Sequence, residues 1–182
     1  MKRVIGFTGL PGSGKTTALE GVKDLGKIVI MGDVVRNEAI KRNLPLSGKN
    51  LGNISKELRA TYGEDVIAVR CIDLIKDINN YDIIFIDGLR SKEEVKIFRK
   101  IWKFPIIAII IDEERRRKLL LERTRSDDPI SLNEIKKREE REEKFGIVEV
   151  IKSVDYQIVN DGNKEALKKK TRSLVKKIIE NY

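Results

Sequence analysis

The sequence predicts an α/β protein in three layers, with a five-stranded parallel sheet between two layers of helices. Short apolar runs recur along the chain without polar alternation, which is typical of parallel strands covered on both faces. Stretches with helical periodicity separate these runs, and this alternation favours right-handed strand–helix–strand crossovers. The expected strands are residues 4–8, 28–31, 83–87, 104–111 and 156–159.

Two of the intervening helices are expected to begin at capping boxes, at Ser91 to Glu94 and at Ser131 to Glu134. Residues 165–182 have the pattern of an amphipathic helix. Two stretches fit no simple strand–helix unit: a polar stretch at about 33–62 and a dense charge run at about 115–145. We expect both to be inserts over the carboxyl edge of the sheet, where open α/β sheets bind ligands.

The length of 182 residues suits one domain, residues 1–182. A net charge of +9 is compatible with nucleic-acid binding, which is possible but not favoured, and equally with a site for phosphorylated small molecules. The chain has no histidine, which excludes His general-base chemistry and His metal sites. Any catalysis must therefore use carboxylates, Lys, Arg, backbone amides and metal.

The single cysteine, Cys71, lies in an apolar-periodic stretch. We expect a buried, inert thiol in a protein of the reducing cytoplasm, without an intrachain disulfide. The longest apolar run is only strand-sized, and the chain passes from Met1 to Arg3 directly into a strand. A membrane span and a signal peptide are therefore not expected. The sequence does not indicate an oligomeric state.

A glycine-rich loop follows the first expected strand and precedes a helix, and it matches G-x-x-x-x-G-K-[ST] at every fixed position. Glycines let backbone N–H groups converge on phosphate oxygens, Lys15 reaches the β- and γ-phosphates, and the Thr16 hydroxyl ligates Mg²⁺. The pattern therefore predicts binding of a nucleoside triphosphate with Mg²⁺, and by itself it is compatible with GTPases, motor ATPases and kinases. The expected cofactor-binding residues here are Gly9, Leu10, Pro11, Gly12, Ser13, Gly14, Lys15, Thr16 and Thr17.

The stretches after this loop resemble the nucleoside monophosphate kinases, adenylate kinase above all. The second strand ends in Gly-Asp-x-x-Arg, with Asp33 and Arg36, and the third in Asp-Gly-x-Arg, with Asp87, Gly88 and Arg90. The second motif is one residue shorter than the kinases' Asp-Gly-x-Pro-Arg and lacks its proline. Over nearly the whole chain the sequence is most similar to an archaeal group of adenylate-kinase-related proteins, often likened to dephospho-coenzyme A kinases.

This resemblance implies the fold of a P-loop nucleotide kinase and gives the strand-end residues roles. Arg36, Arg90, Gly88 and Asp33 are expected to bind the acceptor, the two arginines by forking onto its phosphate. Arg36 could instead be a solvated helix arginine, and Arg90 could form a surface salt bridge. Asp87 is the expected magnesium ligand beside Thr16, with a turn aspartate as the alternative. Asp33 could be a helix N-cap, a partner of the magnesium site or a general base, the last only for a hydroxyl acceptor.

The charge run looks like the lid of these kinases, with Arg123, Arg125 and Arg138 neutralising the transferred phosphoryl group. Arg116 could join them, although the whole run could also be ordinary solvated helix faces. Asn160, after the last strand, looks like part of the loop over the donor adenine, with a plain turn as the alternative. The predicted catalytic set is therefore Lys15, Arg123, Arg125, Arg138 and Asp33.

The predicted activity is ATP- and Mg²⁺-dependent transfer of the γ-phosphoryl group to a nucleotide-like acceptor, with AMP or another nucleoside monophosphate favoured. Dephospho-coenzyme A is the alternative acceptor. An RNA- or ribosome-associated ATP-binding assembly factor is the alternative of another class, and a catalytically inactive nucleotide sensor is disfavoured because Lys15, Thr16 and Asp87 are all present.

Overall fold

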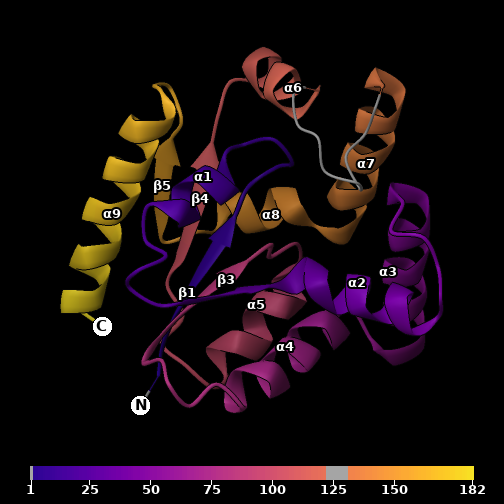
Figure 1. Cartoon of the computed structure of the whole chain (residues 1–182), viewed down its shortest axis with the longest axis horizontal. Coiled ribbons are helices and arrows are strands. Elements are labelled where there is room, and N and C mark those ends of the chain that lie inside the picture. Colours follow the sequence, from indigo (N-terminus) through magenta and orange to yellow (C-terminus); the bar gives the residue numbers. More distant parts are fainter. Residues whose placement is uncertain (1, 122–130) are drawn as a thin grey trace.

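The computed structural model describes residues 2–121 and 131–182 of the chain (Figure 1). Within these ranges, five parallel strands form one sheet in the order β2-β3-β1-β4-β5. The fold class predicted from the sequence is therefore confirmed. The strands are β1 (Arg3–Thr8), β2 (Lys27–Ile30), β3 (Ile83–Asp87), β4 (Ile106–Ile110) and β5 (Tyr156–Val159).

Helices cover both faces of the sheet and rise above its carboxyl edge. In Figure 1, α9 lies at the left, α2 and α3 at the right, and α6 and α7 at the top. The helices are α1 (Lys15–Glu20), α2 (Met31–Lys41), α3 (Gly48–Tyr62), α4 (Val66–Lys76), α5 (Lys92–Arg99), α6 (Glu113–Leu121), α7 (Leu132–Phe145), α8 (Ile147–Lys152) and α9 (Lys164–Glu180).

The sheet divides the core into two apolar clusters, because successive side chains of a strand point to opposite faces. Val4 of β1 belongs to the cluster that includes residues of α2, α3, α4, α5 and α8, whereas Ile5 and Phe7 belong to the cluster that includes residues of α1 and α9. The central strands are buried on both faces, which explains their continuous apolar runs. Cys71 of α4 is fully buried in the first cluster, as the sequence predicted.

The fourth strand begins later than the sequence indicates, at Ile106 rather than at residue 104. Pro105 has no N–H to donate to the ladder, although its carbonyl oxygen accepts a hydrogen bond from Gly6 N at 2.9 Å. Phe104 turns into the core and stacks on Phe98 with ring centroids 4.8 Å apart. The apolar run therefore begins with a core side chain, Phe104, and becomes a strand only from Ile106 onwards.

The predicted capping box at Ser91 is present in full, and Ser131 Oγ accepts a hydrogen bond from Glu134 N at 3.3 Å. The second strand ends at Ile30 and α2 begins at once with Met31, so Ile30 is the N-cap. The N-cap role considered for Asp33 is therefore wrong. Asp33 lies in the first turn of α2, where a carboxylate interacts favourably with the helix dipole.

The two expected inserts correspond to helical pairs. Residues 33–62 are mostly α2 and α3, and the described part of residues 115–145 is mostly α6 and α7.

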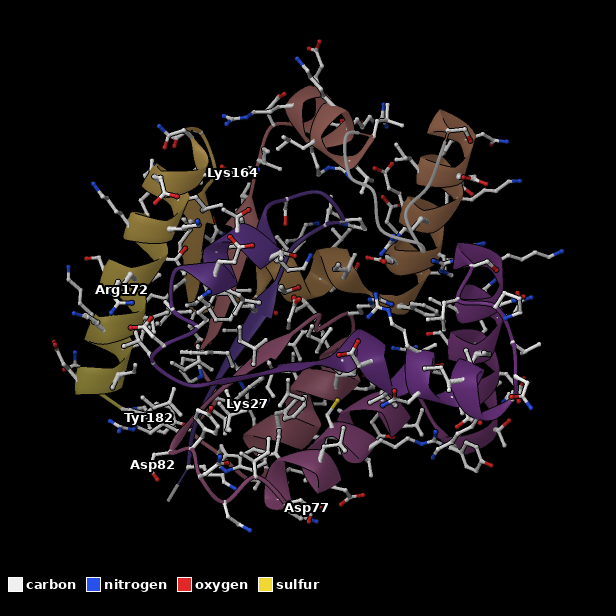
Figure 2. The ribbon with its side chains drawn as sticks, in the orientation of Figure 1. Lys27, Asp77, Asp82, Lys164, Arg172 and Tyr182 are labelled. Atoms are coloured by element: carbon white, nitrogen blue, oxygen red, sulfur yellow. The ribbon has the colours of Figure 1, made fainter. Side chains whose placement is uncertain are left out.

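The C-terminal helix α9 packs along α1, and Tyr182 after it lies beside the start of the sheet (Figure 2). Its hydroxyl accepts a hydrogen bond from Val4 N at 2.9 Å and donates one to Val4 O at 3.3 Å. Among the described residues, no helix is both long and apolar enough to cross a membrane.

Candidate functional site

The phosphate loop connects β1 to α1 at the carboxyl edge of the sheet. Gly12 and Gly14 have φ values of 83° and 102°, which residues with a side chain rarely adopt, and Gly14 is the N-cap of α1. A Cβ at Gly12 would meet the carbonyl oxygen of Arg116 at 2.8 Å, and one at Gly14 would meet Asn160 Nδ2 at 2.6 Å. The glycines are therefore required both by the turn and by the neighbours that pack against it.

The side chain of Asn160 supports this loop from the end of β5. Its Nδ2 donates a hydrogen bond to Ser13 O at 3.0 Å, and its backbone N–H donates to Ile110 O at 2.7 Å. Asn160 is buried, and it also lines the cavity in front of the loop. The residue predicted to lie near the donor adenine thus also holds the glycine-rich loop in place.

The ammonium group of Lys15 folds back over the loop. Its Nζ donates hydrogen bonds to Gly9 O at 2.5 Å and to Leu10 O at 3.3 Å. Burial holds the pKa of Lys15 below its ordinary value, although the nearby carboxylates of Asp87 and Glu142 oppose this shift. A phosphate chain entering the loop would replace these two carbonyl partners with anionic oxygens, which favour the charged ammonium.

Thr16 and Asp87 line the same cavity. Asp87 is the last residue of β3, where the parallel register places it opposite Phe7 of β1 and Ile30 of β2. A hydroxyl and a carboxylate suit Mg²⁺, which is commonly held by one or two carboxylates together with water and substrate phosphates. No group of three or more acidic or Cys side chains that could hold a metal ion occurs in the described ranges, and this site would not need one.

The main cavity has a volume of about 620 Å³ and extends from the glycine-rich loop to residues of α2. Its loop end includes Lys15, Thr16 and Thr17, and its far end includes Arg36 and Arg90. The structure thus brings most of the predicted site residues to one hollow. Those that line it are Gly9, Pro11, Gly12, Gly14, Lys15, Thr16, Thr17, Arg36, Asp87, Gly88, Arg90, Arg138 and Asn160.

Three of the predicted residues that the structure describes do not line this cavity. Leu10 and Ser13 belong to the phosphate loop, where they offer backbone groups, and the Ser13 side chain is buried. Asp33 Oδ1 accepts a hydrogen bond from Arg36 Nη1 at 2.8 Å, so it orients a guanidinium group that does line the cavity. Arg123 and Arg125, which the sequence analysis assigned to a lid, lie outside the described residues.

Arg90 is held by a network that the sequence did not indicate. The carboxylate of Glu94 accepts hydrogen bonds from the backbone N–H groups of Arg90 at 2.8 Å and Ser91 at 3.2 Å. Its other oxygen accepts one from the buried Arg59 at 2.7 Å. The Arg59 guanidinium lies 4.3 Å from the ring centroid of Phe145, at the end of α7. The loop after β3 is therefore tied to both inserts.

Glu142 of α7 is the main residue that the sequence analysis missed. Its side chain is almost fully buried, and its Oε1 lies 3.4 Å from Arg90 Nη2 and 3.5 Å from Arg138 Nε. Burial alone would raise the pKa of this carboxyl group, but Arg90, Arg138, Lys15 and Arg141 together hold it below its usual range. An ionised carboxylate thus lies among the cations of the cleft.

Arg116 and Glu139 were also missed as a pair. Arg116 of α6 is buried, and it donates to Pro11 O at 3.1 Å and to Glu139 Oε1 at 2.5 Å. The helical spacing of α7 could have predicted that both glutamates face inward. Ile135 is apolar, and Glu139 and Glu142 follow it at i+4 and i+7, on the same face of the helix. These two glutamates were indistinguishable by composition from their exposed neighbours.

Another part of the cavity is lined by α9 and by the loop before it. Arg115 donates a hydrogen bond to the carbonyl oxygen of Gly162, and both residues line the cavity together with Leu119 and Leu167. The wall here is partly apolar and partly basic. It is therefore suited to a flat heterocycle whose phosphates extend towards Lys15.

Comparisons with known proteins show which sequences and folds this chain resembles. Residues 5–146 match the AAA_18 family, described as an AAA domain. A UPF0200 protein of Methanococcus maripaludis is 41% identical over 97% of this chain and 98% of its own length. A UPF0200/UPF0201 protein of Archaeoglobus fulgidus is 40% identical over 98% of this chain, which spans only 57% of that relative.

Solved structures with the same fold include TT1252 from Thermus thermophilus, with a TM-score of 0.60 and 19% identity over 98% of this chain and 97% of that one. The shikimate kinase from Aquifex aeolicus has a TM-score of 0.51 and 20% identity over 96% of each chain. At these identities the likeness establishes the fold alone.

Proposed function

This chain belongs to the AAA_18 family and to the UPF0200 proteins, and on that premise we propose that it is an ATP- and Mg²⁺-dependent nucleotide kinase. Its acceptor would be a nucleoside monophosphate, AMP first. The observation that supports this most is the single cavity that joins Lys15 at one end to Arg36 and Arg90 at the other. Such a cavity can hold a phosphoryl donor and a phosphorylated acceptor in line.

The catalytic contribution of the protein would be positioning and charge neutralisation. The backbone N–H groups of the phosphate loop and Lys15 would hold the β- and γ-phosphates. Thr16 and Asp87 would hold Mg²⁺, which supplies charge neutralisation to the phosphate oxygens. Arg138, together with Arg123 and Arg125, would stabilise charge on the transferred group and exclude water from it.

The acceptor end favours a phosphate over a neutral hydroxyl compound. Arg36 of α2 and Arg90 of the loop after β3 line the cavity, and guanidinium groups bind phosphate bidentately. Asp33 contacts Arg36, which fits an orienting role. Phosphorylation of dephospho-coenzyme A is the alternative, and it would need Asp33 to accept a proton from the attacking hydroxyl.

The proposal is tested by incubating the protein with ATP, Mg²⁺ and a panel of nucleoside monophosphates and dephospho-coenzyme A, with products separated by chromatography. We expect ADP formation that depends on AMP and that Lys15→Ala abolishes. A Lys144→Gln variant, altered at an exposed site on α7, serves as the control and should retain activity. If ATP is hydrolysed at the same rate in the presence and in the absence of each acceptor, the proposal is wrong.

A further inference from the structure

Two buried side chains of opposite charge, Arg59 of α3 and Glu94 of α5, meet beside the loop that carries Arg90. Arg59 Nη2 lies 2.7 Å from Glu94 Oε1, and the two side chains are 3% and 0% exposed. Their neighbours in sequence, Leu58 and Val95, belong to the first apolar cluster. The ion pair is therefore part of the interior, and neither residue belongs to the described lining of the main cavity.

Stability alone does not account for a buried ion pair. Removing two charges from water is unfavourable, and such a pair is often no more stabilising than apolar side chains of similar volume. What the pair adds is direction, because a carboxylate and a guanidinium group fix the donors and acceptors around them. The contacts of this pair therefore indicate which parts of the protein it holds in place.

The carboxylate of Glu94 fixes the backbone of the loop after β3. Its Oε2 accepts hydrogen bonds from Arg90 N at 2.8 Å and from Ser91 N at 3.2 Å. A capping box requires only the bond from the N-cap residue, which is Ser91. At the other predicted capping box, which begins at Ser131, the corresponding Glu134 is exposed. The burial of Glu94 and its bond to Arg90 thus go beyond what helix capping needs.

The guanidinium group of Arg59 contacts the end of α7. It lies 4.3 Å from the ring centroid of Phe145, and its Nη1 donates a hydrogen bond to Ser55 Oγ within α3. Phe145 comes three residues after Glu142, so the two are neighbours on one face of α7. Glu142 Oε1 in turn lies 3.4 Å from Arg90 Nη2. The helix is thus attached both to the buried pair and to the side chain of Arg90.

These contacts form a closed ring. It runs from the Arg90 backbone to the Arg90 side chain through Glu94, Arg59, Phe145 and Glu142. Arg90 and Glu142 line the main cavity, whereas the other three members lie outside its described lining. The buried pair can therefore act on the cavity only through the residues that it holds.

We propose that Arg59 and Glu94 are positioning residues, which hold Arg90 and Glu142 in the arrangement that an acceptor meets. The inference rests on the proposed function and deepens it by two residues that do not touch the acceptor. Arg90 is fixed at its backbone and at its side chain, so little of its conformational freedom is left to lose on binding. A loosened ring would leave Arg90 present but less ordered, and the acceptor would bind more weakly.

Arg59→Lys tests the positioning role while it retains the charge. A lysine can still pair with Glu94, but its ammonium group is a point charge that cannot bridge Glu94, Ser55 and Phe145 together. We expect the KM for AMP to rise about 10- to 100-fold, as misplacement of a binding group by about 1 Å does. In steady-state kinetics kcat should change less than about threefold, and so should the ATP affinity in titration calorimetry.

Phe145→Leu breaks the ring at another point, because it removes the aromatic face and retains an apolar side chain. It should raise the KM for AMP in the same way. The double variant Arg59→Lys/Phe145→Leu should be no more impaired than the more affected single variant, since both changes remove one contact. Fully additive effects would mean that the two residues act independently, and the inference would be wrong.

A neutral double variant separates positioning from stability. Arg59→Met alone leaves a buried carboxylate without its cation and should lower the urea midpoint strongly. Arg59→Met/Glu94→Gln removes both charges, and the amide oxygen of the glutamine can still accept from the backbone N–H groups of Arg90 and Ser91. Its midpoint should therefore return most of the way to the wild-type value, while the KM for AMP stays raised at least about tenfold. A KM that recovers together with the midpoint would show a purely structural role and would overturn the inference.

Hydrogen exchange provides a measurement that needs no activity. In Arg59→Met/Glu94→Gln we expect amide exchange to become about tenfold faster both in residues 88–91 and in residues 142–145, with α9 unchanged. Faster exchange in only one of the two segments would show that the ring does not couple them, which would contradict the inference. Lys56→Met on α3 and Glu93→Gln on α5 each remove one exposed charge, and these matched controls should behave like the wild type.

These outcomes are separable from failure of the proposed function. Coupled changes in exchange, in a protein that phosphorylates no acceptor, would retain the positioning ring and exclude the kinase. AMP-dependent turnover whose KM for AMP none of the ring variants alters would retain the kinase and exclude the inference.

Discussion

Arg116 lies directly behind the phosphate loop, and its Nη1 donates a hydrogen bond to the carbonyl oxygen of Pro11 at 3.1 Å. The same guanidinium group donates to Glu139 of α7 at 2.5 Å, and both side chains are buried or nearly so. The first helix of the charged insert is thus attached to the glycine-rich loop. This contact couples the position of the insert to the shape of the loop to which we assign the donor phosphates.

Arg116→Met should therefore destabilise the protein and weaken ATP binding together. Removing one partner of a buried ion pair leaves an uncompensated charge and typically costs about 3–5 kcal/mol. We expect a loss at the lower end of this range, because Arg117 remains 3.6 Å from Glu139. Urea unfolding gives the free energy, and calorimetric titration gives the ATP affinity.

The matched control is Arg117→Met, whose side chain is 45% exposed. Exposed ion pairs contribute about 1 kcal/mol or less, so this variant should unfold much like the wild type. Equal losses in the two variants would show that Arg116 has no special relation to the loop.

Lys15→Met should reduce turnover at least about 100-fold and should also change how stability depends on pH. Burial depresses the pKa of Lys15 in the folded state below its ordinary value of 10.5. Between the two values the unfolded chain binds more protons, so wild-type stability rises with pH across this window. The unfavourable contribution of the buried ammonium is full below the folded pKa and disappears as the pH approaches 10.5.

The Lys15→Met variant lacks this contribution. The unfolding free energy of the wild type should therefore increase relative to that of the variant as the pH rises from 7 towards 10. The lost hydrogen bonds to Gly9 and Leu10 add an offset, and the pH dependence rather than the absolute difference is diagnostic. Urea unfolding at several pH values measures it. Parallel curves for the two proteins would mean that Lys15 is not desolvated.

Cys71 should not react with a thiol reagent at pH 8 while the protein is folded. Burial, followed by the charges of Glu94 and Asp33, raises the pKa of this thiol to about 12, and only the thiolate is a good nucleophile. Unfolding in urea should restore ordinary reactivity within minutes. Rapid labelling of the native protein would show that α4 opens far more readily than its packing indicates.

The sequence predicted those features whose determinants are local. The phosphate loop is one continuous segment, and the capping box at Ser91 is complete within four residues. The roles of Glu142 and Asn160 depend on partners far along the chain, such as Arg90 and Ser13. A charge run does not reveal which of its members face inward unless an apolar residue such as Ile135 sets the phase of the helix.

Strand and helix ends show the same limit. The sequence prediction extended the fourth strand over Phe104 and Pro105. An apolar run does not distinguish a side chain that packs in the core from a residue that pairs with the neighbouring strand. The close contact at Gly52 of α3 was equally hidden. A Cβ there would meet the side chain of Arg141, which is distant in sequence.

Asp33→Asn should separate the two possible acceptor classes. Asp33 Oδ1 lies 2.8 Å from Arg36 Nη1, and its side chain is 49% exposed at the edge of the cleft. A phosphate acceptor is already ionised and needs no base, so the variant should mainly disturb Arg36. We then expect the KM for the acceptor to rise about tenfold while kcat changes less than about threefold.

A hydroxyl acceptor must lose a proton in the reaction, and removing a general base typically lowers kcat by about 10²–10⁴-fold. Steady-state kinetics with the preferred acceptor therefore distinguishes the two cases. Asp73→Asn is the matched control, because Asp73 forms a similar pair with Lys76 at 3.1 Å on the exposed surface of α4. A large fall in kcat for Asp33→Asn alone would exclude a phosphate acceptor and would assign proton removal to this carboxylate.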